Sequence, residues 1–144
     1  MASSEIEDRC RQAGLEVEGS YSGDDGPTVE EAFRMVVNVD VEPSERLSRR
    51  GDGAVDAVGR MWLRRAEERG LIGPEGRVLV AGGLNVGWIR VRVTPETAIS
   101  RIIRNDGNIE LLARSLDGHM ISAIDAEGDD FWLVDAAYPL GVER

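Results

Sequence analysis

The segment from Ser115 to Gly141, SLDGHMISAIDAEGDDFWLVDAAYPLG, constrains the fold of this chain more than any other stretch. Two runs rich in apolar residues flank a short cluster of turn formers, a pattern typical of a β-hairpin. The simplest turn is a three-residue loop, Ala126-Glu127-Gly128. Its register predicts that His119 lies directly opposite Asp135, with both side chains on one face. A two-residue turn at Glu127-Gly128 would instead place them on opposite faces.

Outside the hairpin, the predicted helices lie mainly in the N-terminal half of the chain and the predicted strands mainly in the C-terminal half. Capping residues and apolar spacing predict helices over residues 4–13, 54–69 and 94–103, and a shorter one over residues 28–33. Apolar runs predict strands over residues 35–41, 77–81 and 88–93, and residues 108–115 are read as a further strand. We therefore expect a single α+β domain over residues 1–144, with helices mainly in the N-terminal half packed on a mostly antiparallel sheet of about five strands.

The composition narrows the class of partner. The net charge is −10, from 27 acidic and 17 basic residues, and every basic residue is arginine. This excess of negative charge disfavours nucleic acid, because phosphates are repelled. It suits a basic protein partner, although solubility alone also explains it. The composition is also compatible with a homo-oligomer.

The location of the protein is predicted from what the sequence lacks. No apolar run is long enough for a transmembrane helix, and the acidic N-terminus shows no signal peptide, so we expect no membrane partner. The single cysteine, Cys10, excludes an internal disulfide. A cytoplasmic, reducing compartment is therefore expected.

One predicted strand carries a candidate interface. Over residues 88–93, alternation places Trp88, Arg90 and Arg92 on the same face, away from the apolar residues. Tryptophan and arginine are enriched among the residues that dominate protein interfaces. The same set is equally compatible with an ordinary solvated strand face that has one packed tryptophan. These three residues are the predicted binding site for another protein.

The hairpin also suggests a catalytic alternative. Gly118-His119-Met120, followed by Phe131-Trp132-Leu133-Val134-Asp135, resembles the His/Asp hairpin of papain-like and transglutaminase-like cysteine hydrolases. The resemblance covers residues 115–141 only, and it implies His119 as the general base and Asp135 as the residue that orients it. The nucleophilic cysteine of that family lies upstream at the start of a helix, and Cys10 is the only cysteine of this chain. Cys10 falls in the second turn of its predicted helix on the apolar stripe, which favours a structural role.

Two hypotheses follow from the sequence. The leading one is a small, acidic, non-catalytic protein-binding or regulatory domain. The alternative is a papain-like cysteine hydrolase, amidase or transferase that uses Cys10, His119 and Asp135. No motif predicts a cofactor, and no spacing of histidine and acidic residues predicts a zinc site.

Overall fold

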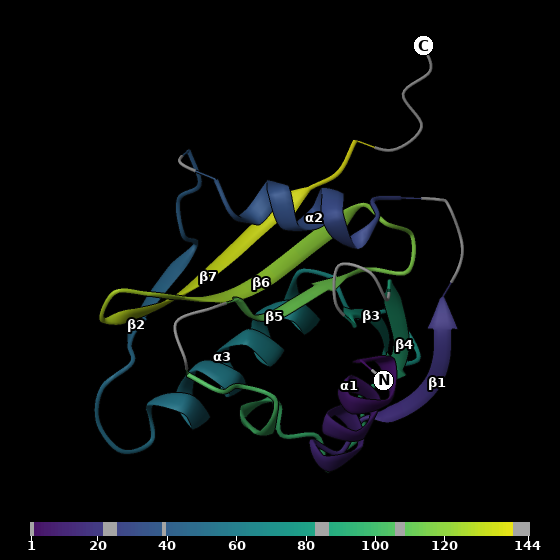
Figure 1. Ribbon diagram of the computed structural model, residues 1–144, viewed down its shortest axis with the longest axis horizontal. Coiled ribbons are helices and arrows are strands. Elements are labelled where there is room, and N and C mark those ends of the chain that lie inside the picture. Colours follow the sequence, from purple (N-terminus) through teal and green to yellow (C-terminus); the bar gives the residue numbers. More distant parts are fainter. Residues whose placement is uncertain (1, 22–25, 39, 83–86, 106–108, 140–144) are drawn as a thin grey trace.

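An antiparallel sheet of seven strands forms the centre of the molecule (Figure 1). The computed structural model describes residues 2–21, 26–38, 40–82, 87–105 and 109–139. The strand order is β1-β4-β3-β5-β6-β7-β2. The strands are β1 (Glu16–Tyr21), β2 (Glu45–Ser48), β3 (Arg77–Ala81), β4 (Trp88–Arg92), β5 (Ile109–Arg114), β6 (Met120–Glu127) and β7 (Asp130–Ala137).

Helices lie on both faces of this sheet (Figure 1). The helices are α1 (Ala2–Gln12), α2 (Val29–Val36), α3 (Ala54–Glu68) and the short 3-10 helix η1 (Ile99–Arg101). α2 packs on one face, and α1, α3 and η1 pack on the other. Among the residues that the structure describes, no helix combines the length and the apolar character needed to cross a membrane.

Two clusters of buried apolar side chains result from this arrangement. The α3-side core lies between the sheet and α1, α3 and η1, and it includes Trp62 and Phe131. The α2-side core lies under α2 and includes Val29, Leu79 and Val134. Strands that are buried on both faces read as nearly continuous apolar runs. The central strands therefore carry little of the alternation that marks a half-exposed strand.

The predicted α+β class and the antiparallel pairing are confirmed, but the sheet has seven strands instead of about five. The predicted N-terminal placement of the helices is confirmed in part, since α1, α2 and α3 lie within residues 2–68 and η1 follows β4. The two strands that the sequence did not reveal, β1 and β2, are the two edges of the sheet. β2 has the sequence ERLS, with Leu47 as its one apolar residue. Edge strands are often short and charged, which prevents pairing with other chains. Their sequences therefore resemble loops.

The predicted strand over residues 35–41 is wrong. Its first part is the end of α2, whose start carries the predicted capping box: the Thr28 side chain accepts a hydrogen bond from the Glu31 N–H, and Glu31 accepts one from Thr28. α2 buries residues at helical spacing, Val29, Ala32 and Val36. This helical face and its cap prevail over the alternation of the following valines.

The predicted turn and register of the hairpin are also wrong. β6 and β7 join at the two-residue turn Gly128-Asp129, and Ser122 pairs with Asp135. His119 and Asp135 consequently belong to opposite faces of the hairpin. All residues from 121 to 126 are buried. Because both faces of β6 are buried, the apolar pattern does not select one register over another.

The sheet has a notch between β3 and β5. Within the described residues these strands pair at two positions, Leu79 with Arg114 and Val80 with Ala113. In contrast, β5 is paired with β6 at five positions. The end of β3 and the start of β5 therefore part from each other in the middle of the sheet.

Candidate functional site

Cys10 is buried in the core and does not line an open cleft. Its side chain has 0% exposure and belongs to the α3-side core. Burial raises the pKa of the Cys10 thiol to about 11, and the charge of Arg9 offsets this only in part. Because the thiolate is the nucleophilic form of cysteine, a thiol with this pKa is protonated and inert at neutral pH.

His119 precedes β6 and is exposed. Its carbonyl oxygen accepts a hydrogen bond from the Tyr138 N–H at 2.7 Å, and its Nδ1 lies 3.0 Å from the Tyr138 carbonyl oxygen. Tyr138 packs against the α2-side core, whereas Cys10 belongs to the α3-side core on the other face of the sheet. The structure therefore does not bring Cys10 and His119 together.

Asp135 ties β7 to α3. Its Oδ2 accepts a hydrogen bond from Arg65 Nη2 at 2.6 Å. Burial raises the pKa of Asp135, but hydrogen bonds from Arg65, Ser122 and Ser44 together outweigh it and hold the pKa below its usual range. The carboxylate is thus charged and engaged on the α3 side, where it cannot orient the ring of His119.

Trp88, Arg90 and Arg92 share one face of β4, but they do not form an exposed patch. Trp88 is only 4% exposed, and its indole N–H donates a hydrogen bond to a backbone carbonyl oxygen at 2.9 Å. The two arginines pair with carboxylates of β1, at 3.2 Å between Arg90 and Glu18 and 2.8 Å between Arg92 and Glu16. The predicted interface thus lacks its exposed aromatic residue, and a protein partner stays a prediction.

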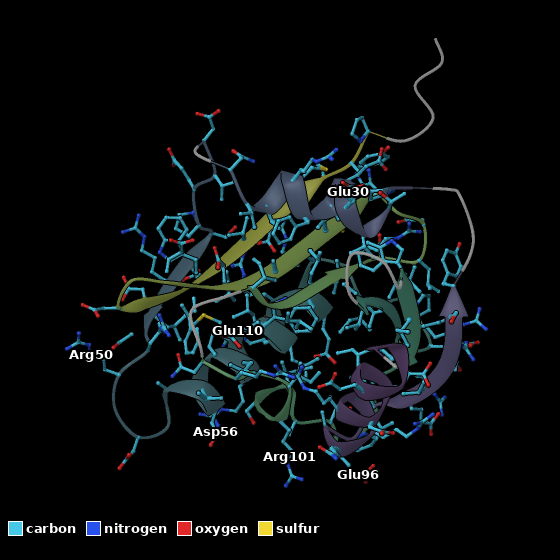
Figure 2. All side chains as sticks on the ribbon, viewed as in Figure 1. Glu30, Arg50, Asp56, Glu96, Arg101 and Glu110 are labelled. Carbon is cyan, nitrogen blue, oxygen red and sulfur yellow. The ribbon has the colours of Figure 1, made fainter. Side chains whose placement is uncertain are left out.

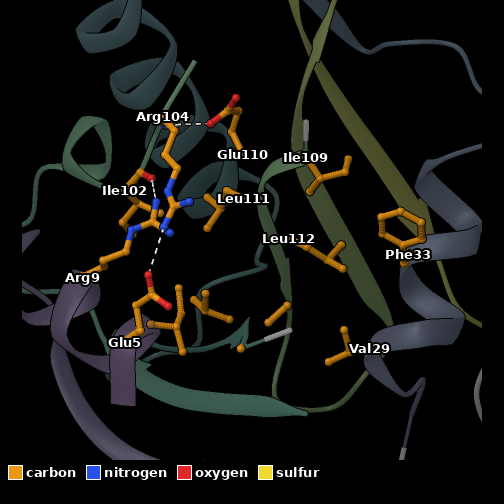
Figure 3. Close-up of a pocket in the computed structure, with 14 residues that line it drawn as sticks. Glu5, Arg9, Val29, Phe33, Ile102, Arg104, Ile109, Glu110, Leu111 and Leu112 are labelled. Carbon is orange, nitrogen blue, oxygen red and sulfur yellow. Dashed lines mark hydrogen bonds and ion pairs between the residues drawn. The ribbon is translucent and has the colours of Figure 1, made fainter. Parts of the chain in front are cut away.

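A pocket that the sequence did not reveal lies at the notch of the sheet (Figure 3). Its volume is about 310 Å³, which is within the usual range for small-molecule sites. It has walls from α1, α2, β3 and β5 and from the segment that follows η1. The pairing of β5 with β6 shifts at this point, between Ile109 and Leu111. Such bulges occur often next to functional sites, where they redirect side chains.

One end of the pocket is polar. Arg9 donates a hydrogen bond through Nη2 to the Ile102 carbonyl oxygen (Figure 3). Arg104 lies beside it, with its Nη2 3.4 Å from Glu5 Oε2 and its backbone N–H donating to Glu110 Oε1 at 2.7 Å. Burial lowers the pKa of Arg9, and the positive charge of Arg104 lowers it further. Two guanidinium groups therefore lie close together, with Arg9 partly buried and the Arg104 side chain 53% exposed (Figure 3).

The other end of the pocket is apolar. Figure 3 shows Val29 and Phe33 of α2 across the pocket from the two arginines, with Leu112 of β5 on the same side. Val29 and Leu112 are buried, at 3% and 4% exposure. The pocket thus changes from charged to apolar along its length, an arrangement that can hold a molecule with one polar end.

Sequence reasoning missed this pocket because its parts are far apart in the chain. In the sequence, Arg9 lies within the predicted helix over residues 4–13, and Arg104 follows the predicted helix over residues 94–103. A long-range contact between α1 and the segment after η1 brings them together. The sequence does hold one weak signal, the charged residue Glu110 inside the otherwise apolar run IELLA. A buried charge requires a partner, and the buried carboxylate of Glu110 lines the pocket.

Comparison with protein-family models, with curated proteins and with solved structures found no match for the chain. The resemblance to papain-like hydrolases accordingly stays a prediction. Within the described ranges, no group of three or more histidine, cysteine or acidic side chains is placed to hold a metal ion. The interpretation of the pocket rests on its geometry and chemistry.

Proposed function

We propose that this chain is a non-catalytic regulatory domain that binds a small molecule in the notch pocket. The observation that carries the proposal is the position of the pocket, at a break in the central sheet and between helices of both layers. An occupant would contact α1 on one side and α2 on the other. A ligand that binds only the folded arrangement stabilises it, so occupancy would tighten the contact between the layers.

The separation of Cys10, His119 and Asp135 supports the non-catalytic part of the proposal. A nucleophile and its base must come within hydrogen-bond reach of each other. Here the thiol is in the α3-side core, and the residue paired with His119, Tyr138, packs in the α2-side core. Asp135 is engaged by Arg65. Each of the three side chains has a structural environment of its own.

An NMR titration tests the proposal. A set of small fragments that differ in polarity is added to the ¹⁵N-labelled protein, and amide chemical shifts are followed. We expect shifts concentrated at the end of β3 and in the residue that follows it (residues 80–82) and in β5 (residues 109–112). The matched variant is Ala81→Leu, because Ala81 lines the pocket and is half-buried, so that a larger side chain fills the space. If no fragment shifts these amides, or if Ala81→Leu leaves the shifts unchanged, the pocket is not a binding site.

A further inference from the structure

The polarity of the notch pocket defines the chemistry of its ligand. The polar end offers donors from two guanidinium groups, and the apolar end offers aliphatic and aromatic side chains (Figure 3). Figure 2 labels Glu110 of β5, a side chain that lines the same pocket and is only 8% exposed. A ligand that matches both ends has a charged or polar head and an apolar body.

Arg9 is the residue that remains available to such a head group. A guanidinium carries five N–H donors in a planar fork that matches a carboxylate. Arg9 uses one of its groups on the Ile102 carbonyl oxygen. In the parts of the chain that the structure describes, no carboxylate lies within ion-pair distance of Arg9. Its remaining donors can therefore serve a ligand.

The carboxylates at this end are already engaged by the protein. Glu5 pairs with the Arg104 guanidinium at 3.4 Å, and Glu110 accepts a hydrogen bond from the Arg104 N–H at 2.7 Å. A cationic head group would have to compete with these contacts and would also meet two arginines. An anionic head group would instead complete the contacts of Arg9. The positive charge of Arg104 beside Arg9 favours an anion at this position, and the negative charges of Glu5 and Glu110 offset this in part.

We infer that the pocket binds a small monocarboxylate with an apolar body, whose carboxylate is held by Arg9 and whose body lies against Val29, Phe33 and Leu112. This inference rests on the proposed function, since it names the class of ligand for the same pocket. The cavity of about 310 Å³ equals the volume of roughly ten water molecules in the liquid, so the ligand has about ten non-hydrogen atoms. A straight-chain carboxylate such as octanoate has this size.

Three probes of equal chain length test the inference: octanoate, octan-1-ol and octylamine. Binding is measured by isothermal titration calorimetry and by the shift of the thermal midpoint of the intact protein. We expect octanoate to bind about tenfold or more tightly than octan-1-ol, because a charge-assisted hydrogen bond is replaced by a neutral one, and we expect octylamine to bind most weakly.

Two variants with the same loss of charge locate the head group. Arg9→Gln should remove the preference for octanoate over octan-1-ol. Arg11→Gln should retain it, because Arg11 is exposed on the same helix and pairs with Asp8 at 3.1 Å. Ala81→Leu should weaken all three probes. Circular dichroism and a thermal melt confirm that each variant is folded before it is compared.

The outcomes separate this inference from the proposed function. If octan-1-ol or octylamine binds in an Ala81-dependent manner and octanoate binds no more tightly, the pocket is a binding site as proposed, but its ligand is not a carboxylate. If octanoate is preferred but Arg9→Gln retains the preference, Arg9 is not the anchor and the inference fails. If none of the probes binds, or if Ala81→Leu has no effect on any of them, both the inference and the proposed function fail.

Discussion

A buried carboxyl group in β6 gives the sharpest test of the physical reasoning. Asp125 is 6% exposed and lies between Ile109 of β5 and Trp132 of β7. Burial raises the pKa of Asp125 to about 7, and a hydrogen bond with Glu127 and the negative charges of Glu127 and Glu110 act in the same direction. The folded chain therefore holds a proton on Asp125 at a pH where an exposed aspartate has lost it.

The sign of the effect on stability follows from linkage. The pKa of Asp125 in the folded state, about 7, lies above the unfolded value near ~3.9, so the folded state binds the proton more tightly. The free energy of unfolding consequently falls as the pH rises from about 4 to about 8. The whole difference corresponds to roughly 4 kcal/mol at about 1.4 kcal/mol per pKa unit, and about 2 kcal/mol of it is lost between about pH 5.5 and pH 8.

The substitution Asp125→Asn removes this dependence, because the amide cannot ionise. Urea unfolding of both proteins at about pH 5.5 and pH 8 should show that the wild type loses about 2 kcal/mol relative to the variant. The repulsion among the other acidic residues acts equally on both proteins, so the difference isolates Asp125. Asp129→Asn, at the exposed tip with 73% side-chain exposure, is the matched control and should leave the profile unchanged. Parallel pH profiles for the wild type and Asp125→Asn would refute the reasoning.

Three further predictions concern the core. Asp135→Ala should lower the free energy of unfolding by about 3–5 kcal/mol in urea at neutral pH, because the partly buried Arg65 loses this partner. The pKa of Asp135 is lowered in the folded state, so the stability that Asp135 contributes is present above about pH 4 and should disappear as acid is added. Gly59→Ala should destabilise α3 by about 1–3 kcal/mol in thermal melts, despite the better helix propensity of alanine, because a Cβ atom would lie 2.8 Å from the backbone nitrogen of Ser100; a more stable variant would contradict this packing. Cys10 should resist iodoacetamide in the native protein and react in urea, as mass spectrometry would show, and rapid native labelling would contradict its burial.

Local signals in the sequence were sufficient for the elements that carry their own pattern. The strand over residues 77–81 is β3 with the same bounds, and the long amphipathic helix over residues 54–69 is α3 within one residue. The capping box at Thr28 is present as predicted. In each of these elements, the residues that specify it, whether a cap or a periodic apolar face, are close together in the sequence. The element can therefore be predicted without knowledge of its tertiary contacts.

Features that depend on distant pairing were not predictable in the same way. β2 becomes a strand only because it pairs with β7, and nothing in the sequence ERLS indicates that partner. The register of the hairpin depends on its turn, and β6, which is buried from residue 121 to residue 126, accepts more than one register on the apolar pattern alone. The same limit applies to the site. Arg9 and Arg104 are 95 positions apart, and they meet only after α1 packs beside the segment that follows η1.

The notch itself has an energetic consequence that supports its use as a site. A central sheet normally pairs every strand along its length, since backbone N–H and C=O groups that lose a partner away from water are costly. Among the residues that the structure describes, β3 and β5 are not paired beyond Val80 and Ala113, whereas Ala81 still pairs with Trp88 of β4 and Leu112 with Ala123 of β6. Filling a cavity commonly stabilises a protein, and natural sequences retain such defects where function requires them. If the notch were only a packing defect, Ala81→Leu would raise the thermal midpoint with no loss of ligand response. A ligand site instead requires that the same substitution, whatever it does to stability, weakens the response to the probes that bind the wild type.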